Sequence, residues 1–165
     1  MAMRDPVVVK EVSVCLPFGI GAVKWNVDST EREAAWSLYV ELVTRIAVQP
    51  LDVDQGLIRE ALNSLYSMFG ITREVLKKAG PKVGASKRSV GGIAIAVLNN
   101  GLRPFLAKWH PRLQAWEVKR PAELSFQEHE KNWLEEPKFR LELSQLRNDL
   151  EQYANALANI ADIEI

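Results

Sequence analysis

Residues 30–49 read TEREAAWSLYVELVTRIAVQ, and this stretch decides the expected fold. Thr30 and Glu33 match a capping box at its start, and Pro50 ends it. Further caps stand just before it: Asp28 and Ser29. Its few polar interior residues fall on one narrow stripe at helical spacing: Ser37, Glu41, Thr44 and Arg45. A helix that is apolar around most of its circumference is normally surrounded by other elements. We therefore expect the central helix of an all-α core near residues 29–49.

The composition is that of an ordinary soluble globular domain. The chain has 165 residues, of which 47% are hydrophobic and 25% are charged, so we expect a single domain over residues 1–165. Basic and acidic residues both number 21, so no overall charge favours nucleic acid or an anionic membrane. The single cysteine, Cys15, cannot form an internal disulfide or a Cys-rich zinc site.

The sequence also indicates a cytoplasmic protein. Residues 1–5 do not begin a signal peptide, because no cationic start is followed by an apolar stretch. The most apolar run, residues 91–98, is far shorter than the roughly 20 residues that cross a bilayer. We expect no membrane association.

Two patterns predict the elements on either side of the central helix. Residues 7–27 alternate around a possible turn at residues 17–21, which is typical of a β-hairpin. We expect residues 1–28 to form this hairpin or an extended arm, packed outside a bundle that spans residues 29–165. The second helix should run over residues 56–79 and end at Gly80.

The second half of the chain predicts two more main helices, giving a bundle of four. The third begins near Ser89 and should break at residues 99–104, and residues 109–111 should turn the chain. Ser125 and Glu128 match a second capping box, which starts the final helical region.

The last helix carries the clearest periodicity. Its apolar residues step by four and three alternately: Phe139, Leu143, Leu146, Leu150, Tyr153, Leu157 and Ile160. This seam is either one wall of the core, which is the default, or a face for a partner. Small residues on a second face, Ala154, Ala156 and Ala158, permit close approach. We therefore expect a protein partner, with a weak preference for a homodimer.

Six basic residues and one acidic residue lie between positions 73 and 88, which predicts a binding surface. The basic residues are Arg73, Lys77, Lys78, Lys82, Lys87 and Arg88. They could receive a phosphate or an acidic partner, or form a solvated loop. Residues 123–136 carry five acidic residues and one basic one, so pairing of the two patches within or between chains would account for both without nucleic acid. Trp109 and Trp116, near Trp133, are candidates for an aromatic binding patch, although such residues more often lie in the core.

No strong catalytic or metal-binding constellation is present. The two histidines, His110 and His129, do not stand at a metal-binding spacing, so we expect neither a metal nor a cofactor. Arg103 precedes His110 with six residues between them. This spacing resembles that of the small helical ribonucleases of the HEPN class, in which the arginine would hold the scissile phosphate and the histidine would handle protons. The alternative is that His110 is structural and bonds a carbonyl near a helix end.

Several segments resemble an uncharacterised family of small bacterial all-α proteins. The resemblance rests on EAAW with ELVTR in residues 33–45, REALNSLY in residues 59–66, and LRPFLAKWHP with WE in residues 102–117. It covers most of the chain and implies no catalytic residues. Because the family is associated with bacterial conflict and defence gene clusters, the resemblance implies a non-enzymatic interaction module, regulatory or adaptor in role.

Overall fold

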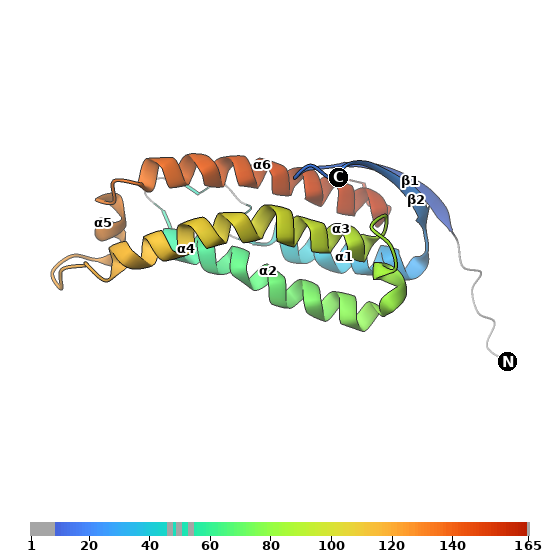
Figure 1. Cartoon of the computed structure of the whole chain (residues 1–165), viewed down its shortest axis with the longest axis horizontal. Coiled ribbons are helices and arrows are strands. Elements are labelled where there is room, and N and C mark those ends of the chain that lie inside the picture. Colours follow the sequence, from blue (N-terminus) through green and yellow to red (C-terminus); the bar gives the residue numbers. More distant parts are fainter. Residues whose placement is uncertain (1–8, 46–47, 49–50, 53–54, 165) are drawn as a thin grey trace.

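The computed structural model describes residues 9–45, 48, 51–52 and 55–164. Its helices lie alongside one another, and a two-stranded hairpin wraps one end of them (Figure 1). In chain order the elements are β1 (Lys10–Leu16), β2 (Gly21–Val27), α1 (Ser29–Val43), α2 (Ile58–Ala79), η2 (Pro81–Gly84), α3 (Val90–Ala96), η3 (Val97–Leu102), α4 (Arg103–Glu117), α5 (Phe126–Lys131) and α6 (Glu136–Ile160).

The predicted hairpin is present, but it is not an arm outside the bundle. Its strands pair antiparallel, with Val14 opposite Val23. Every second residue points inward, and the inward residues belong to the same hydrophobic core as the helices: Val12, Val14, Leu16, Val23 and Val27. A lone hairpin is marginally stable in water, and β1 gains its support by packing on α6.

The all-α fold class is therefore wrong. The fold is mixed and mostly helical, with an N-terminal antiparallel sheet that contributes to the core. The hydrophobic alternation predicted the hairpin, but a local sequence pattern does not indicate whether a hairpin contributes to the core of the helices or lies outside it.

The helix expected at residues 29–49 forms, but it is not surrounded. Its N-cap is Asp28, whose side chain accepts a hydrogen bond from the Glu31 amide at 2.9 Å, so the capping box at Thr30 is not used. The helix ends at Val43, and Ile46, Ala47, Gln49 and Pro50 lie outside the described residues. α1 packs between α2 and α6 and leaves one face open, where Trp36 is 50% exposed. The expectation of a central helix is wrong because apolar residues at these positions are not all core residues.

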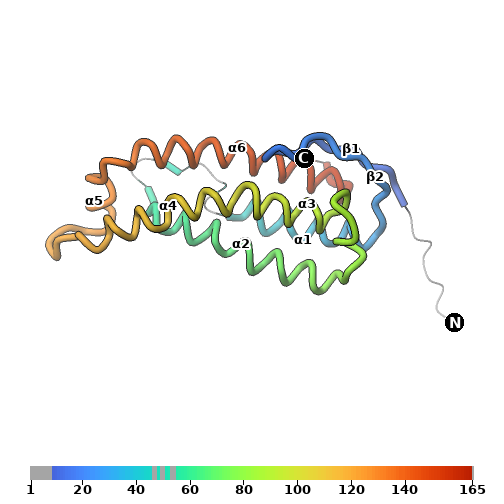
Figure 2. The backbone as a smooth tube through the Cα atoms, viewed as in Figure 1, coloured from blue at the N-terminus to red at the C-terminus, as the bar shows by residue number. Residues whose placement is uncertain are grey.

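α3, η3 and α4 form one continuous helix, which Figure 2 shows as an unbroken tube. The expected break at residues 99–104 is absent because the chain widens there into a π-helix, η3. A π turn relieves the clash between a proline ring, here that of Pro104, and the preceding carbonyl groups. Gly101 lies so close to Phe18 that an added Cβ would stand 2.6 Å from that ring.

The turn expected at residues 109–111 is also absent. Pro111 lies inside α4, where the buried side chains of Trp109 and Leu113 hold the helix against the core. Tertiary packing thus outweighs the local preference of proline to end a helix.

The two last helices follow the sequence pattern closely. Ser125 and Glu128 form the predicted capping box at the start of α5. The seven apolar seam residues of α6 are all buried, so the seam is a wall of the core and not a face for a partner. Ala154, Ala156 and Ala158 are buried too and are already used within the chain.

One helix, Val90–Glu117, is long and apolar enough to cross a membrane by length and composition alone. Within its most apolar part 56% of the residues are buried inside the protein, as in the core helix of a soluble protein.

Candidate functional site

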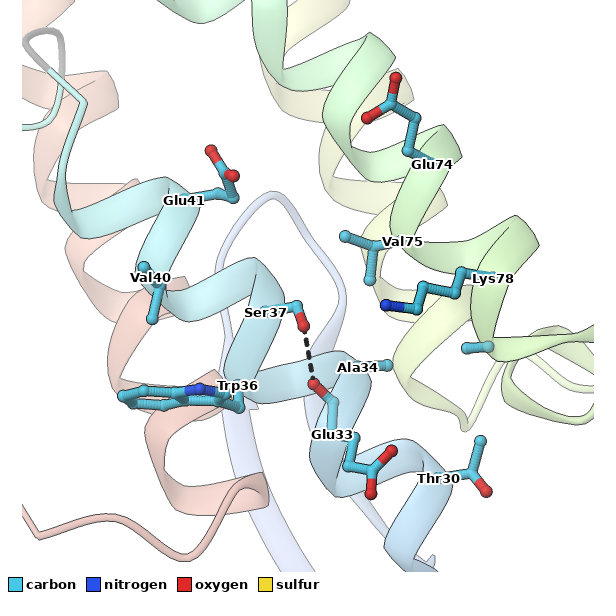
Figure 3. Close-up of a pocket in the computed structure, with 11 residues that line it drawn as sticks. Thr30, Glu33, Ala34, Trp36, Ser37, Val40, Glu41, Glu74, Val75 and Lys78 are labelled. Carbon is cyan, nitrogen blue, oxygen red and sulfur yellow. Dashed lines mark hydrogen bonds between the residues drawn. The ribbon is translucent and has the colours of Figure 1, made fainter.

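The open face of α1 borders a groove against α2, which we call the α1/α2 groove (Figure 3). Its volume is about 570 Å³. Trp36 and Val40 stand on the outer side of α1, while Val75 and Lys78 of α2 point toward α1. Trp36 stacks on Tyr39, with ring centroids 6.0 Å apart. The groove therefore mixes polar and apolar side chains, and an exposed aromatic side chain stands at its edge on the outer side of α1.

Carboxylates dominate the rim of this groove. Glu33, Glu41 and Glu74 line it, against one ammonium group, that of Lys78. Glu41 forms an ion pair with Arg45 at 2.7 Å, as the sequence spacing predicts. Neither Glu33 nor Glu74 forms an ion pair with any residue that the structure describes. The rim thus presents two carboxylates without ion-pair partners among the described residues, next to the apolar side chains of Val75 and Ala79.

A second hollow lies between α2 and α4, and we call it the α2/α4 pocket. Its volume is about 290 Å³, and it is lined by Tyr66, Phe69, Arg73, Arg103, Leu106, Ala107 and His110. The candidate catalytic pair Arg103 and His110 therefore faces one open pocket. Seven residues make nearly two helical turns, so the sequence spacing alone places both side chains on one face of α4.

The imidazole of His110 is held by a residue that the sequence analysis missed. Nη1 of Arg59 lies 3.1 Å from Nδ1 of His110. Because a guanidinium can only donate, the histidine nitrogen accepts this hydrogen bond. Arg59 also donates two hydrogen bonds to Glu117, at 2.7 and 2.8 Å. His110 therefore bonds a guanidinium and not the carbonyl group expected for a structural histidine. In the sequence, the one sign of a cluster of Arg59, His110 and Glu117 is the seven-residue spacing of His110 and Glu117 on α4.

The basic residues between positions 73 and 88 do not form one binding surface. Arg73 lines the α2/α4 pocket, and Lys78 lines the α1/α2 groove. Lys77 borders a shallow hollow beside η2, and Lys87 and Arg88 border a groove between the hairpin and α3. All of these side chains are exposed, as is Lys82. The helical part of the stretch distributes its charges around α2, so the predicted single patch is wrong.

The predicted aromatic patch is also wrong. Trp109 is fully buried among Phe105, Trp133 and Phe139, and Trp133 is only 5% exposed. Trp116 is half-buried, stacks on His129 at 4.4 Å and donates a hydrogen bond to the His129 carbonyl. These rings form the core at the α5 end of the molecule, which is the alternative that the sequence analysis left open.

The acidic residues 123–136 do not pair with the basic stretch within the chain. They lie at the α5 end of the molecule, whereas the basic loop lies at the opposite end, near the hairpin (Figure 1). Local partners take up several of them: Glu135 pairs with Arg112 at 2.8 Å, and Glu136 pairs with Arg140 at 2.5 Å.

Two buried carboxylates join distant helices. Glu31 accepts hydrogen bonds from the Val90 amide at 3.1 Å and from Nε1 of Trp25 at 3.2 Å. Both carboxylate oxygens of Glu130 accept a hydrogen bond from the Ile58 amide, at 2.7 and 3.0 Å. Burial raises the pKa of both carboxyl groups, and the hydrogen bonds from Val90 and Ile58 oppose that rise. Each carboxylate thus caps the start of a helix from far away in the sequence, which is a structural role.

Among the residues that the structure describes, no group of three His, Cys, Asp or Glu side chains could hold a metal ion. The family models, curated proteins and solved structures that were compared with this chain give no match. The α1/α2 groove and the α2/α4 pocket are therefore the two candidate sites.

Proposed function

We propose that the chain is a non-enzymatic interaction module that binds a partner protein in the α1/α2 groove. The observation that carries this proposal is Trp36, a large aromatic side chain held half-exposed at the edge of the groove. Tryptophan is among the side chains that most often dominate binding energy at protein interfaces. Because Trp36 stacks on Tyr39, its ring is already ordered, which lowers the entropic cost of binding.

The chemistry of the rim suggests the kind of partner. Trp36, Val40 and Val75 supply apolar contact, and Glu33 and Glu74 supply uncompensated negative charge. An amphipathic helix with apolar residues on one face and lysine or arginine beside them would match both features. We therefore commit to a basic amphipathic segment of another protein as the occupant.

The resemblance to an uncharacterised bacterial family suggests the setting. On that basis we propose that the chain is cytoplasmic and acts as a regulatory or adaptor component of a bacterial conflict or defence system. A second copy of the chain is the other candidate occupant, and light scattering over a dilution series separates a homodimer from a complex with another protein.

The test begins with capture of partners from the native host and continues with the purified pair. Trp36→Ala should weaken the binding of the purified partner at least about tenfold, because a central aromatic anchor is lost. Glu33→Lys should weaken it as well, and added salt should reduce the difference between Glu33→Lys and the unaltered chain. Titration calorimetry measures all three effects.

Leu134→Ala is the matched control, because Leu134 is 95% exposed and far from the groove. It should bind the partner as the unaltered chain does. The proposal is refuted if Trp36→Ala and Leu134→Ala bind alike, or if the chain alone turns over a substrate.

A second candidate function is metal-independent RNA cleavage by Arg103 and His110, in the manner of the HEPN class. The observation that favours it is that both side chains line one open pocket. The hydrogen bond from Arg59 to His110 weakens it, because that bond occupies a ring nitrogen that proton transfer would need. Incubation with RNA should show cleavage that His110→Ala abolishes; cleavage that persists in that variant would come from elsewhere.

A further inference from the structure

We propose that the α2/α4 pocket binds a nucleotide, with Arg73 and Arg103 on its phosphate and Tyr66 against its base. This inference is independent of the partner-binding groove, which lies between α1 and α2. It concerns binding only, so it stands whether or not the pocket cleaves RNA.

The first support is a pair of guanidinium groups without carboxylate partners. The Cζ atoms of Arg73 and Arg103 lie 5.9 and 5.1 Å from the centroid of the same ring, that of Phe69. Neither arginine forms an ion pair with a described residue. Contact with the ring holds both cations over the pocket while leaving most of their N–H donors available. Two arginines from neighbouring helices are therefore poised for the several oxygens of one phosphate.

The second support is the aromatic side of the same pocket. The Tyr66 side chain is 64% exposed, although it lies edge-on to the His110 ring at 6.5 Å and beside Phe69 at 6.3 Å. An exposed ring that is braced by two neighbours offers a flat face for a nucleobase. An inorganic anion would use only the arginines, whereas a nucleotide would use the arginines and this ring together.

The third support is the way in which Arg103 is positioned. The π-helix η3 ends at Leu102, immediately before Arg103. Within it, Oδ1 of Asn99 accepts a hydrogen bond from Nε of Arg103 at 3.2 Å. Short π-helical turns inside α-helices are frequent at functional sites. Here the π-helix supplies an amide that holds Nε of the guanidinium and leaves its two terminal nitrogens available to a ligand in the pocket.

A second pair of cations lies over one ring, but both carry carboxylate partners: Lys108 and Arg112 contact the Trp109 ring and pair with Glu142 and Glu135. Arg59, which bonds His110 beside the pocket, is compensated by Glu117. Lys77 is exposed on a different face of α2, and Arg88 lies at the hairpin end. Lys77 and Arg88 serve as matched controls, since each carries the same charge without the aromatic setting.

The experiment titrates the full chain with AMP, adenosine and inorganic phosphate by calorimetry. We expect AMP to bind at least about tenfold more tightly than either of the other two ligands, because only AMP engages both halves of the pocket. A short oligoadenylate forms the fourth arm: if it binds more tightly than AMP, the natural ligand is an RNA strand, and if not, it is a free nucleotide.

Substitutions assign the effect to the pocket. Arg73→Gln and Arg103→Gln should each weaken AMP binding about tenfold, while Tyr66→Ala should weaken AMP but leave phosphate unchanged. Lys77→Gln and Arg88→Gln should have no effect. All five positions are exposed, and thermal unfolding of each variant checks that it is folded.

Equal affinity for AMP and phosphate would overturn the base contact, and equal affinity for AMP and adenosine would overturn the phosphate contact. Equal loss in the pocket variants and the control variants would overturn the site, leaving only general attraction to positive charge. Trp36→Ala should leave AMP binding intact, so failure of this proposal is distinguishable from failure of the partner-binding proposal.

Discussion

Trp109→Ala is expected to lower the free energy of unfolding by about 3–5 kcal/mol, the usual cost of removing a large buried aromatic side chain. The Trp109 side chain is fully buried, and three aromatic rings surround it with centroids 5.2 to 6.5 Å away: Phe105, Trp133 and Phe139. Its Nε1 donates a hydrogen bond to Glu142 at 2.8 Å. The substitution leaves a cavity where α4, α6 and the α5 end of the chain meet.

Urea denaturation of three variants measures this effect. Trp109→Phe should lose roughly 1–2 kcal/mol, because a ring remains but the hydrogen bond to Glu142 does not. Trp36→Ala should cost less than Trp109→Ala, because Trp36 is half-exposed. If Trp36→Ala and Trp109→Ala proved equally destabilising, the core assigned to the α5 end would be wrong.

Glu31→Ala is expected to cost about 2–4 kcal/mol, because it leaves one buried donor and one part-buried donor without an acceptor. These donors are the Val90 amide and the Trp25 indole N–H, which lie on α3 and on β2. Glu31→Gln should cost much less, because one amide oxygen can stand where Oε1 of Glu31 accepts both hydrogen bonds. Denaturation at neutral pH compares the two variants.

The pH dependence of the Glu31→Gln variant gives an independent check. Burial raises the pKa of the Glu31 carboxyl above its ordinary value of 4.5 in the folded protein. As the pH rises from 4.5 through the higher pKa of the folded state, the unfolded chain loses this proton first, so stability falls over that window. Well below pH 4.5 both states hold the proton, so this loss of stability does not occur there.

Glutamine does not titrate, so the stability of Glu31→Gln relative to the unaltered chain should improve between about pH 4 and pH 7. A difference that stays constant across this range, or that changes in the opposite direction, would contradict the assignment of a buried, desolvated carboxyl group at this position.

The sequence predicted those parts of the fold that depend on local periodicity. The alternation of Val12, Val14 and Leu16 located β1, and the seam from Phe139 to Ile160 located α6 and its buried face. It did not predict that α1 has an open face, because Trp36 and Val40 resemble core residues when only their hydrophobicity is considered.

The prediction of a break between α3 and α4 was wrong for a different reason. Asn99, Asn100 and Pro104 each favour a break, and the helix continues only because a π-helical segment and tertiary packing compensate for them. A prediction from neighbouring residues cannot include the contact between Gly101 and Phe18, because these residues are far apart in the sequence.

For the candidate sites, too, the sequence indicates features within one helix but not the contacts between helices. Arg103 and His110 are seven positions apart, which places them on one face of a continuous helix. The sequence predicted a break at residues 99–104 and a turn at residues 109–111, so it did not predict that helix, and the structure brings both side chains to one pocket. The other half of that pocket, Tyr66, Phe69 and Arg73, comes from α2, and the sequence does not say which helices become neighbours. For the same reason the spread of the basic residues over several hollows could not be predicted.

The capping of helices by distant carboxylates has a consequence for the order of folding. The first amides of α3 and α2 are bonded by Glu31 and Glu130, which lie 59 and 72 positions away along the chain. Neither of these long-range caps exists until loops of that length have closed. α2 has no side-chain cap of its own, so an isolated α2 would fray at its start, whereas Ser89 caps the Gly92 amide of α3 locally. The first turn of α2 therefore forms late, together with long-range docking, and the Ile58 amide should exchange with solvent hydrogen only when the whole domain opens.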